Sequence, residues 1–137
     1  MPEKRILITE NHRQRLQALL QSACRLLPAE RPHLYQLLED LENAIVMSAD
    51  SIPPQVVTID RQVHIRDMEA GYHSQFRLVF PRDADIRENR ISVLSPIGAS
   101  LMGAQAGDVV EVSAPRGTKW LRVVNVLQPE PVSGKAA

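Results

Sequence analysis

The sequence predicts an α+β fold, in which a short N-terminal antiparallel helical hairpin (a coiled coil) precedes an antiparallel sheet domain with one small helix. Apolar residues recur at helical spacing up to about residue 45, whereas short runs rich in β-branched residues follow from residue 56. The paired prolines Pro53-Pro54 stand between the two patterns. We therefore expect a helical hairpin within residues 1–48 and a second domain over residues 49–137.

The hairpin is predicted from the caps and breaks around two apolar stripes. Thr9 is a favourable N-cap with Glu10 in the following turn, and the first stripe is Leu16, Leu19, Leu20, Ala23, Leu26 and Leu27. Residues from Pro28 to Pro32 end this helix, and Pro32 suits the first position of the next one. The second stripe is Leu34, Leu37, Leu38, Leu41 and Ile45. Each arm then has roughly 16 residues, which corresponds to a length of about 24 Å at a rise of about 1.5 Å per residue.

Residues 48–54 are predicted to be a stiff, extended linker, because they are polar and carry the double proline. The expected strands are 56–59, 63–65, 76–80, 91–94, 109–112 and 120–127. Short strands at this spacing favour an antiparallel sheet. Residues 115–118, Pro-Arg-Gly-Thr, are expected to form the turn between the last two strands.

A small helix is expected between the strands. Ser95 is a natural N-cap, Pro96 fits the first helical position, and Gly103 is a natural C-terminal stop. The helix should therefore have about two turns.

Composition excludes several classes of protein. The 137 residues contain 16 Lys+Arg and 16 Asp+Glu, so the net charge is zero, and residues before Ser48 are neutral as are those after it. A phosphate-driven nucleic-acid binder needs a basic excess that this chain lacks. Cys24 is the single cysteine, and no apolar stretch is long enough for a signal peptide or a membrane span. We expect a cytoplasmic protein without a membrane partner.

Catalytic and metal-binding patterns are also missing. The four histidines, His12, His33, His64 and His73, are not spaced as metal ligands, and Cys24 has no partner at ligand spacing. Ser95 is expected to act as a helix cap and lies in no G-x-S-x-G motif. We expect no metal, no cofactor and no catalytic activity.

One stretch carries a family resemblance. Residues 90–103 read Arg-Ile-Ser-Val-Leu-Ser-Pro-Ile-Gly-Ala-Ser-Leu-Met-Gly, and Gly-Asp-Val-Val-Glu-Val follows at 107–112, with the Pro-x-Gly turn at 115–117. This combination resembles the C-terminal domain of the bacterial Gre transcript-cleavage factors, the GreA/GreB family, and extends over most of residues 53–127. In length and layout the chain is similar to the Rnk group, regulators of nucleoside diphosphate kinase, which are shortened Gre relatives.

The resemblance implies an FKBP-like fold for the C-terminal domain and binding to bacterial RNA polymerase near its secondary channel. In Gre factors the segment around the Ser-Pro motif belongs to the docking surface, which assigns that role to Ser95, Pro96 and Ile97. Leu94 stands where those factors commonly have Asp or Asn. Their longer coiled coil carries a pair of acids thought to hold Mg²⁺, whereas the tip here offers Glu30 beside Arg31.

The leading hypothesis is a transcription regulator that binds RNA polymerase without stimulating transcript cleavage, because one carboxylate on a short arm is a poor Mg²⁺ ligand set. The alternative is an active Gre-type elongation and transcript-cleavage factor that uses Glu30. For the tip itself, a plain polar loop is the simpler interpretation. A peptidyl-prolyl isomerase, suggested by the implied fold alone, would need an aromatic-lined pocket, and the chain has only 2 Phe, 2 Tyr and 1 Trp.

Overall fold

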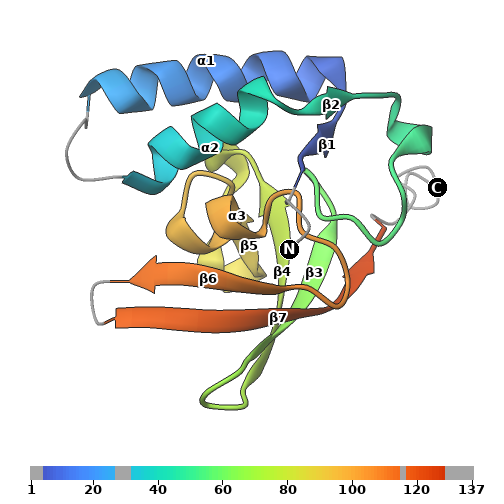
Figure 1. The fold of residues 1–137 in the computed structure, drawn as a ribbon, viewed down its shortest axis with the longest axis vertical. Helices are drawn as coiled ribbons and strands as arrows, with labels where there is room; N and C mark the ends of the chain where they lie inside the picture. Colours follow the sequence, from blue (N-terminus) through green and yellow to red (C-terminus); the bar gives the residue numbers. More distant parts are fainter. Residues whose placement is uncertain (1–4, 27–31, 115–116, 129–137) are drawn as a thin grey trace.

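The computed structural model describes residues 5–26, 32–114 and 117–128 of the chain (Figure 1). It confirms the α+β class. Two helices lie together at one end of the molecule, and a five-stranded sheet with one short helix forms the rest (Figure 1). Every helix in these ranges is too short or too polar to cross a bilayer.

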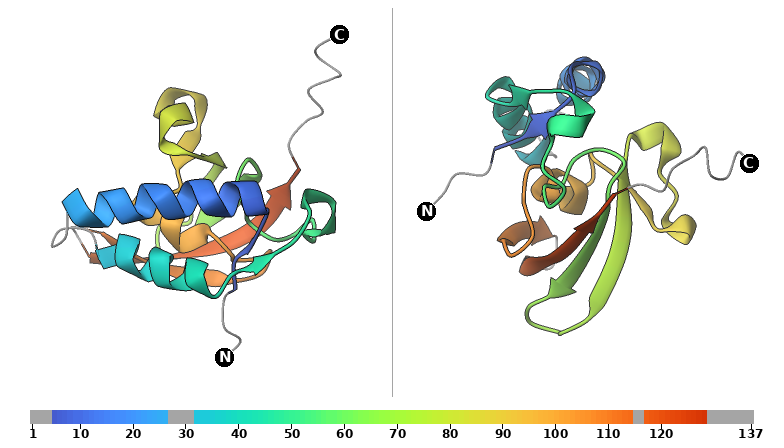
Figure 2. Two further views of the ribbon diagram at one scale, coloured as in Figure 1. Left: turned by 90° about the horizontal axis from the view of Figure 1, so that it is seen from above. Right: turned by 90° about the vertical axis from the view of Figure 1, so that its right-hand side faces the viewer.

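The N-terminal hairpin consists of α1 (Glu10–Leu26) and α2 (Pro32–Glu42), which lie side by side in both views (Figures 1 and 2). The predicted cap is confirmed, because the Thr9 hydroxyl oxygen accepts a hydrogen bond from the backbone N–H of His12 at 3.2 Å. Glu10 accepts hydrogen bonds from the side chains of Arg13 and Gln14, and these bonds lower the pKa of Glu10 to about 2.

The second arm is shorter than its apolar stripe predicts. α2 has 11 residues and ends at Glu42, whereas Ile45 lies in strand β2 (Ile45–Val46). This strand pairs in parallel with β1 (Leu7–Ile8), which the sequence patterns did not reveal. The Ile45 N–H donates to the Ile6 carbonyl at 2.9 Å, so the backbone leaves the helix to bond the N-terminal segment. The Ile45 side chain is 40% exposed instead of continuing the buried stripe.

The linker is bent and anchored, in contrast to the extended connection expected. Residues Ala49–Ser51 form a 3₁₀ turn, and Ile52 is buried. The guanidinium of Arg61 is also buried and donates to the carbonyls of Ile52, Pro53 and Val56 at 3.1, 2.6 and 2.8 Å. Three acceptors compensate the loss of water around this cation, although burial still lowers the pKa of Arg61. Arg61 thereby fixes the end of the linker against the sheet.

The strand expected at 56–59 is wrong, although the segment is buried. Val57 and Ile59 belong to the core, yet this segment has only an isolated bridge between Val56 and Gln105. The Val57 N–H donates to Ala104, and its carbonyl accepts from Gly103. These β-branched residues therefore run beside the loop after the short helix instead of joining the sheet.

The sheet has the order β5-β4-β3-β7-β6. Its strands are β3 (Gln62–Asp67), β4 (His73–Val79), β5 (Arg90–Ser92), β6 (Val109–Ala114) and β7 (Gly117–Leu127). All neighbours are antiparallel except β4 and β5, which pair in parallel because two 3₁₀ turns, Pro81–Asp83 and Ile86–Glu88, carry the chain back. Of the predicted turn at 115–118, Pro115 and Arg116 lie outside the described residues.

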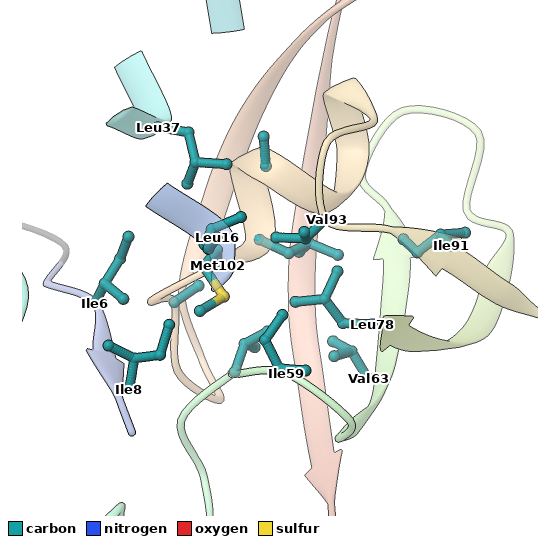
Figure 3. Packing of buried hydrophobic residues seen from close by; sticks show 14 of the residues in the cluster. Ile6, Ile8, Leu16, Leu37, Ile59, Val63, Leu78, Ile91, Val93 and Met102 are labelled. Atoms are coloured by element: carbon teal, nitrogen blue, oxygen red, sulfur yellow. The ribbon is translucent and has the colours of Figure 1, made fainter. Parts of the chain in front are cut away.

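A single cluster of buried side chains connects the hairpin to the sheet. Figure 3 shows Ile8 of β1 and the preceding Ile6 in the same region as Leu16 of α1, Leu37 of α2 and Leu78 of β4. On the flank of this cluster, Arg15 lies over the buried ring of Phe80, with its guanidinium carbon 4.1 Å from the ring centre. The core thus runs across the expected boundary between residues 48 and 49.

Candidate functional site

The segment predicted as a docking surface joins β5 to the short helix α3 (Pro96–Leu101). Ser95 caps this helix as expected: its hydroxyl oxygen accepts from the Gly98 N–H at 3.0 Å. The same hydroxyl donates to the Ser92 carbonyl at 2.7 Å, and the Ser95 N–H also reaches that carbonyl, at 3.0 Å. The Ser92 hydroxyl in turn accepts from the Leu94 N–H at 2.9 Å. These four bonds fix the backbone from residue 92 to residue 98.

Gly98 is required by this arrangement. A Cβ atom at residue 98 would overlap the carbonyl oxygen of Ser92 and lie 3.0 Å from the Ser95 hydroxyl oxygen. The turn can close only when position 98 has no side chain, because a backbone carbonyl cannot move aside as a flexible side chain can. The glycine of the Ser-Pro-Ile-Gly sequence therefore has a packing reason.

The side chains of this turn differ in exposure. Pro96 is exposed at the first position of α3, and Ser95 is half-buried. Leu94 and Ile97 are partly buried and pack against the hydrophobic core. We call residues 94–97 the Ser-Pro segment. It presents a rigid proline on a backbone that is held from both sides, which is suitable for contact with another macromolecule because little conformational freedom remains to be lost.

The hairpin is bonded directly to the Ser-Pro segment. His33, at the start of α2, places its Nε2 atom 3.0 Å from the carbonyl oxygen of Leu94. A carbonyl only accepts, so Nε2 must carry the proton in this bond. α2 also packs against α3. Sequence patterns did not predict this contact, because His33 and Leu94 lie in separate predicted domains.

The other predicted site residues lie at the tip of the hairpin. Glu30 and Arg31 fall outside the described residues. Within the described part of the chain, no group of three or more His, Cys, Asp or Glu residues could hold a metal ion. The Ser95 hydroxyl is engaged with the backbone, since it donates to the Ser92 carbonyl and accepts from the Gly98 N–H. Ser95 therefore has a structural role as the cap of α3.

The structure brings together two histidines that sequence spacing kept apart. The Nε2 atom of His64 on β3 lies 2.9 Å from Nδ1 of His73 on β4. In this hydrogen bond one ring nitrogen donates its N–H and the other accepts it. His64 lies opposite Gln75, and His73 lies two residues away from Gln75 on the same face, so the two histidines form a diagonal cross-strand pair. The predicted strand at 76–80 began after His73, so the sequence patterns did not indicate this proximity.

More than half of the chain is similar to a known protein family. The family model "Transcription elongation factor, GreA/GreB, C-term" matches residues 52–128. Proteins named transcription elongation factor GreA are 37% identical over 93 residues in Thermotoga neapolitana and 32% identical over 93 residues in Clostridium beijerinckii, each match covering 68% of this chain. These matches cover 59% and 58% of the two relatives, so the chain spans well under two thirds of their length.

A solved structure extends the comparison to the helical hairpin. The prokaryotic transcription elongation factor GreA/GreB from Nitrosomonas europaea superposes with a TM-score of 0.74 and 31% sequence identity. The match covers 91% of this chain and 99% of that one. The similarity thus includes residues on the N-terminal side of the segment that the family model matches.

Proposed function

The chain belongs to the GreA/GreB family of transcription elongation factors, and from this premise we propose that it is a regulator that binds bacterial RNA polymerase through the Ser-Pro segment. Binding near the secondary channel would place Ser95, Pro96 and Ile97 against the enzyme. The observation that carries this proposal is the backbone lock from Ser92 to Gly98, which holds Pro96 exposed. The names of the relatives support an association with transcription elongation.

The contact between His33 and Leu94 gives the hairpin a part in this function. Because α2 is bonded to the Ser-Pro segment and packs on α3, the direction of the hairpin is fixed relative to the docking surface. A factor bound through Pro96 would therefore present its hairpin tip in one defined direction. Such a factor could occupy the polymerase site that a cleavage factor needs.

We further propose that the protein is not an enzyme and does not stimulate transcript cleavage. Two features support this. Glu30 is the only acid between Leu26 and Pro32, and Mg²⁺ held by protein needs at least one further carboxylate or a substrate phosphate. The second arm has 11 helical residues, which at 1.5 Å per residue gives about 16 Å of helix. A short arm with one acid is poorly suited to delivering a metal ion into the polymerase.

The single acid and the short second helix also support placing the chain in one group within the GreA/GreB family. We propose that the chain belongs with the Rnk group, the shortened Gre relatives, and that residues 1–48 form its hairpin unit and residues 49–137 its docking unit. The shared core makes these two units mechanically dependent on each other. The site of action would then be the cytoplasm, where the polymerase is found.

Binding to immobilised RNA polymerase core enzyme tests the docking proposal. We expect the wild-type chain to bind and Pro96→Arg to bind at least about tenfold more weakly, since a central contact residue is worth more than about 1 kcal/mol. Pro54→Arg is the matched control, because Pro54 is also an exposed proline that follows a turn. Equal binding by both variants, or no binding by the wild type, contradicts the proposal.

An assay of nascent-RNA cleavage in stalled elongation complexes tests the proposal that the protein does not stimulate transcript cleavage. We expect no stimulation by the wild-type chain, and we expect inhibition when an active cleavage factor is added in competition. Stimulation that disappears in Glu30→Ala would instead favour the alternative, an active transcript-cleavage factor.

A further inference from the structure

The face of the sheet that points away from the core carries a compact group of exposed side chains on β3, β7 and β6 and on Met68, the residue that follows β3. We call it the outer patch. Its members are Arg66, Met68, Glu111, Val109, Trp120 and Arg122. The register gives their arrangement. Trp120 lies opposite Glu111, and Arg122 lies between Arg66 on one neighbouring strand and Val109 on the other. The Met68 N–H donates to the Trp120 carbonyl at 2.9 Å, which continues the pairing of β3 with β7.

Alternation along the strands shows that this group lies on the outer side. Leu121 and Val123 of β7 are buried in the core, so Trp120 and Arg122 must point the other way. On β6, Val112 is buried between outward-facing neighbours. The short helix α3 packs on the covered side, since Ala99 and Leu101 belong to the same buried cluster. The outer patch and the Ser-Pro segment are therefore separate surfaces, and Figure 1 shows β6 and β7 away from α1 and α2.

The outer patch exposes large apolar side chains. Trp120 is 49% exposed, Val109 47% and Met68 41%. Trp, Met and Arg are enriched in protein interfaces. Isolated exposed apolar side chains are common on protein surfaces, whereas a contiguous group of them often marks an interaction site. This part of the sheet resembles the centre of an interface more than a solvated face.

The outer patch has two arginines, Arg66 and Arg122, and one carboxylate, Glu111, so it keeps a net positive charge. Arg66 and Arg122 lie directly opposite each other, and neither forms an ion pair with any residue that the structure describes. Like charges in this cross-strand position repel. The two guanidiniums flank apolar side chains and can each bind a carboxylate in a bidentate manner. An acidic ligand would remove the repulsion that the isolated chain retains.

We propose that the outer patch binds an acidic protein segment that carries both carboxylate and apolar side chains. The carboxylates pair with Arg66 and Arg122, and the apolar side chains cover Trp120, Met68 and Val109. The composition favours protein over nucleic acid. Proteins that bind a nucleic-acid strand stack successive bases on several aromatic rings, whereas the patch has one ring, Trp120, and its other apolar members are Met68 and Val109.

The chain contains its own reporter for this binding, because Trp120 is its single tryptophan. The probe is a synthetic amphipathic peptide of Glu and Leu without aromatic residues, titrated into the full-length protein at low salt. We expect the Trp120 emission to shift to the blue as the ring leaves water, and the shift to disappear at high salt. A peptide with Lys in place of Glu should leave the emission unchanged.

The double variant R66E/R122E tests the charges while keeping the reporter. We expect its affinity for the acidic peptide to fall at least about tenfold, with no loss of binding to polymerase through the Ser-Pro segment. R82E is the matched control, because Arg82 is exposed in the 3₁₀ turn at residues 81–83 and outside the patch. Equal urea-unfolding midpoints for the three proteins show that folding is retained.

Several results would overturn the proposal. These are an unchanged emission with the acidic peptide, an equal response to the Lys peptide, or full affinity in R66E/R122E. A shift with oligouridylate alone would assign the face to RNA. Sedimentation that rises with protein concentration and is abolished by R122E would assign it to a second copy of this chain.

Discussion

The imidazole of His33 donates from Nε2 to the carbonyl oxygen of Leu94 at 3.0 Å, and this bond connects the helical hairpin to the segment that precedes α3. Leu94 begins the turn that Ser92 and Ser95 lock, so the bond reaches the proposed docking surface directly. The hairpin therefore contributes to the position of the Ser-Pro segment as well as to the core.

Replacing His33 tests this connection. We expect His33→Leu to lower the free energy of unfolding by about 1 kcal/mol, because the Leu94 carbonyl loses its donor. His33→Gln, whose amide can donate in place of the imidazole, should lose less. Urea denaturation of the three proteins gives the comparison. If His33→Leu is as stable as the wild type, the bond does not hold α2 on the Ser-Pro segment.

Adding one methyl group at Gly98 should lower the free energy of unfolding more than His33→Leu does. Gly98→Ala places a Cβ atom against the Ser92 carbonyl, so the turn must open and the cap must weaken. We expect a loss of about 3 kcal/mol, the upper end for overpacking of a tight site. Gly71→Ala is the control, since Gly71 has positive φ but open space around it, and backbone strain alone should cost about 1 kcal/mol. Thermal unfolding of both variants compares the steric clash in Gly98→Ala with the backbone strain in Gly71→Ala. Equal losses of stability in the two variants would contradict the clash.

Removing the buried cation should release the linker. We expect Arg61→Met to lower the free energy of unfolding by about 3 kcal/mol, because the Ile52, Pro53 and Val56 carbonyls lose charged donors. Arg82→Met, at an exposed position, should change it by less than about 0.5 kcal/mol. Faster exchange of the Ile52, Val56 and Val57 amides in Arg61→Met would locate the effect, and unchanged exchange there would contradict it.

The protein should become less stable as the pH drops below neutral, because folding lowers the pKa of His12. Burial against the edge of Phe80 is the main cause that lowers the pKa of His12 from 6.5, and Arg15 adds to it while Asp60 opposes it. At a pH just below about 6.5, His12 is protonated in the unfolded chain but remains neutral in the folded chain. The free energy of unfolding therefore decreases as the pH falls from about 6.5 toward the lower pKa of the folded state. Unfolding free energies measured across this range should vary less in His12→Gln than in the wild type.

The two predicted domains should not fold independently. A fragment of residues 49–137 lacks Ile6, Ile8, Leu16, Leu20 and Leu37, which are all at most 2% exposed in the whole chain. Each such side chain contributes about 1.5–3 kcal/mol through burial, so their joint loss approaches the whole stability of a typical domain. We expect a poorly dispersed amide NMR spectrum for the fragment. A well-dispersed spectrum with cooperative melting would contradict the shared core.

Local signals in the sequence were sufficient for much of this fold. Thr9 and Pro32 mark the starts of α1 and α2, and Ser95, Pro96 and Gly103 mark both ends of α3. β3, β4, β6 and β7 lie where the β-branched runs predict strands. The Ser-Pro motif also identified the family, which the comparison with known proteins confirms. Whether Ser95, Pro96 and Ile97 contact polymerase stays a prediction.

Other features depend on segments that are distant in sequence. Ile45 continues a helical stripe, yet it leaves α2 because β1 offers a strand partner. Val56–Ile59 has the composition of a strand, but its backbone bonds the loop after α3. The pairing of His64 with His73 and the opposed arginines of the outer patch arise from strand register.

What the sequence by itself determined are the caps, the proline breaks, the apolar periods and the family motif, because each depends on interactions within a few residues. The tertiary structure alone decided which backbone each segment would bond and which polar side chains would meet. His33 reaches Leu94, and Arg61 holds the linker, only after burial of the shared core has brought the hairpin and the sheet together. Such contacts are selected by the packing of the whole chain, and no local pattern encodes them.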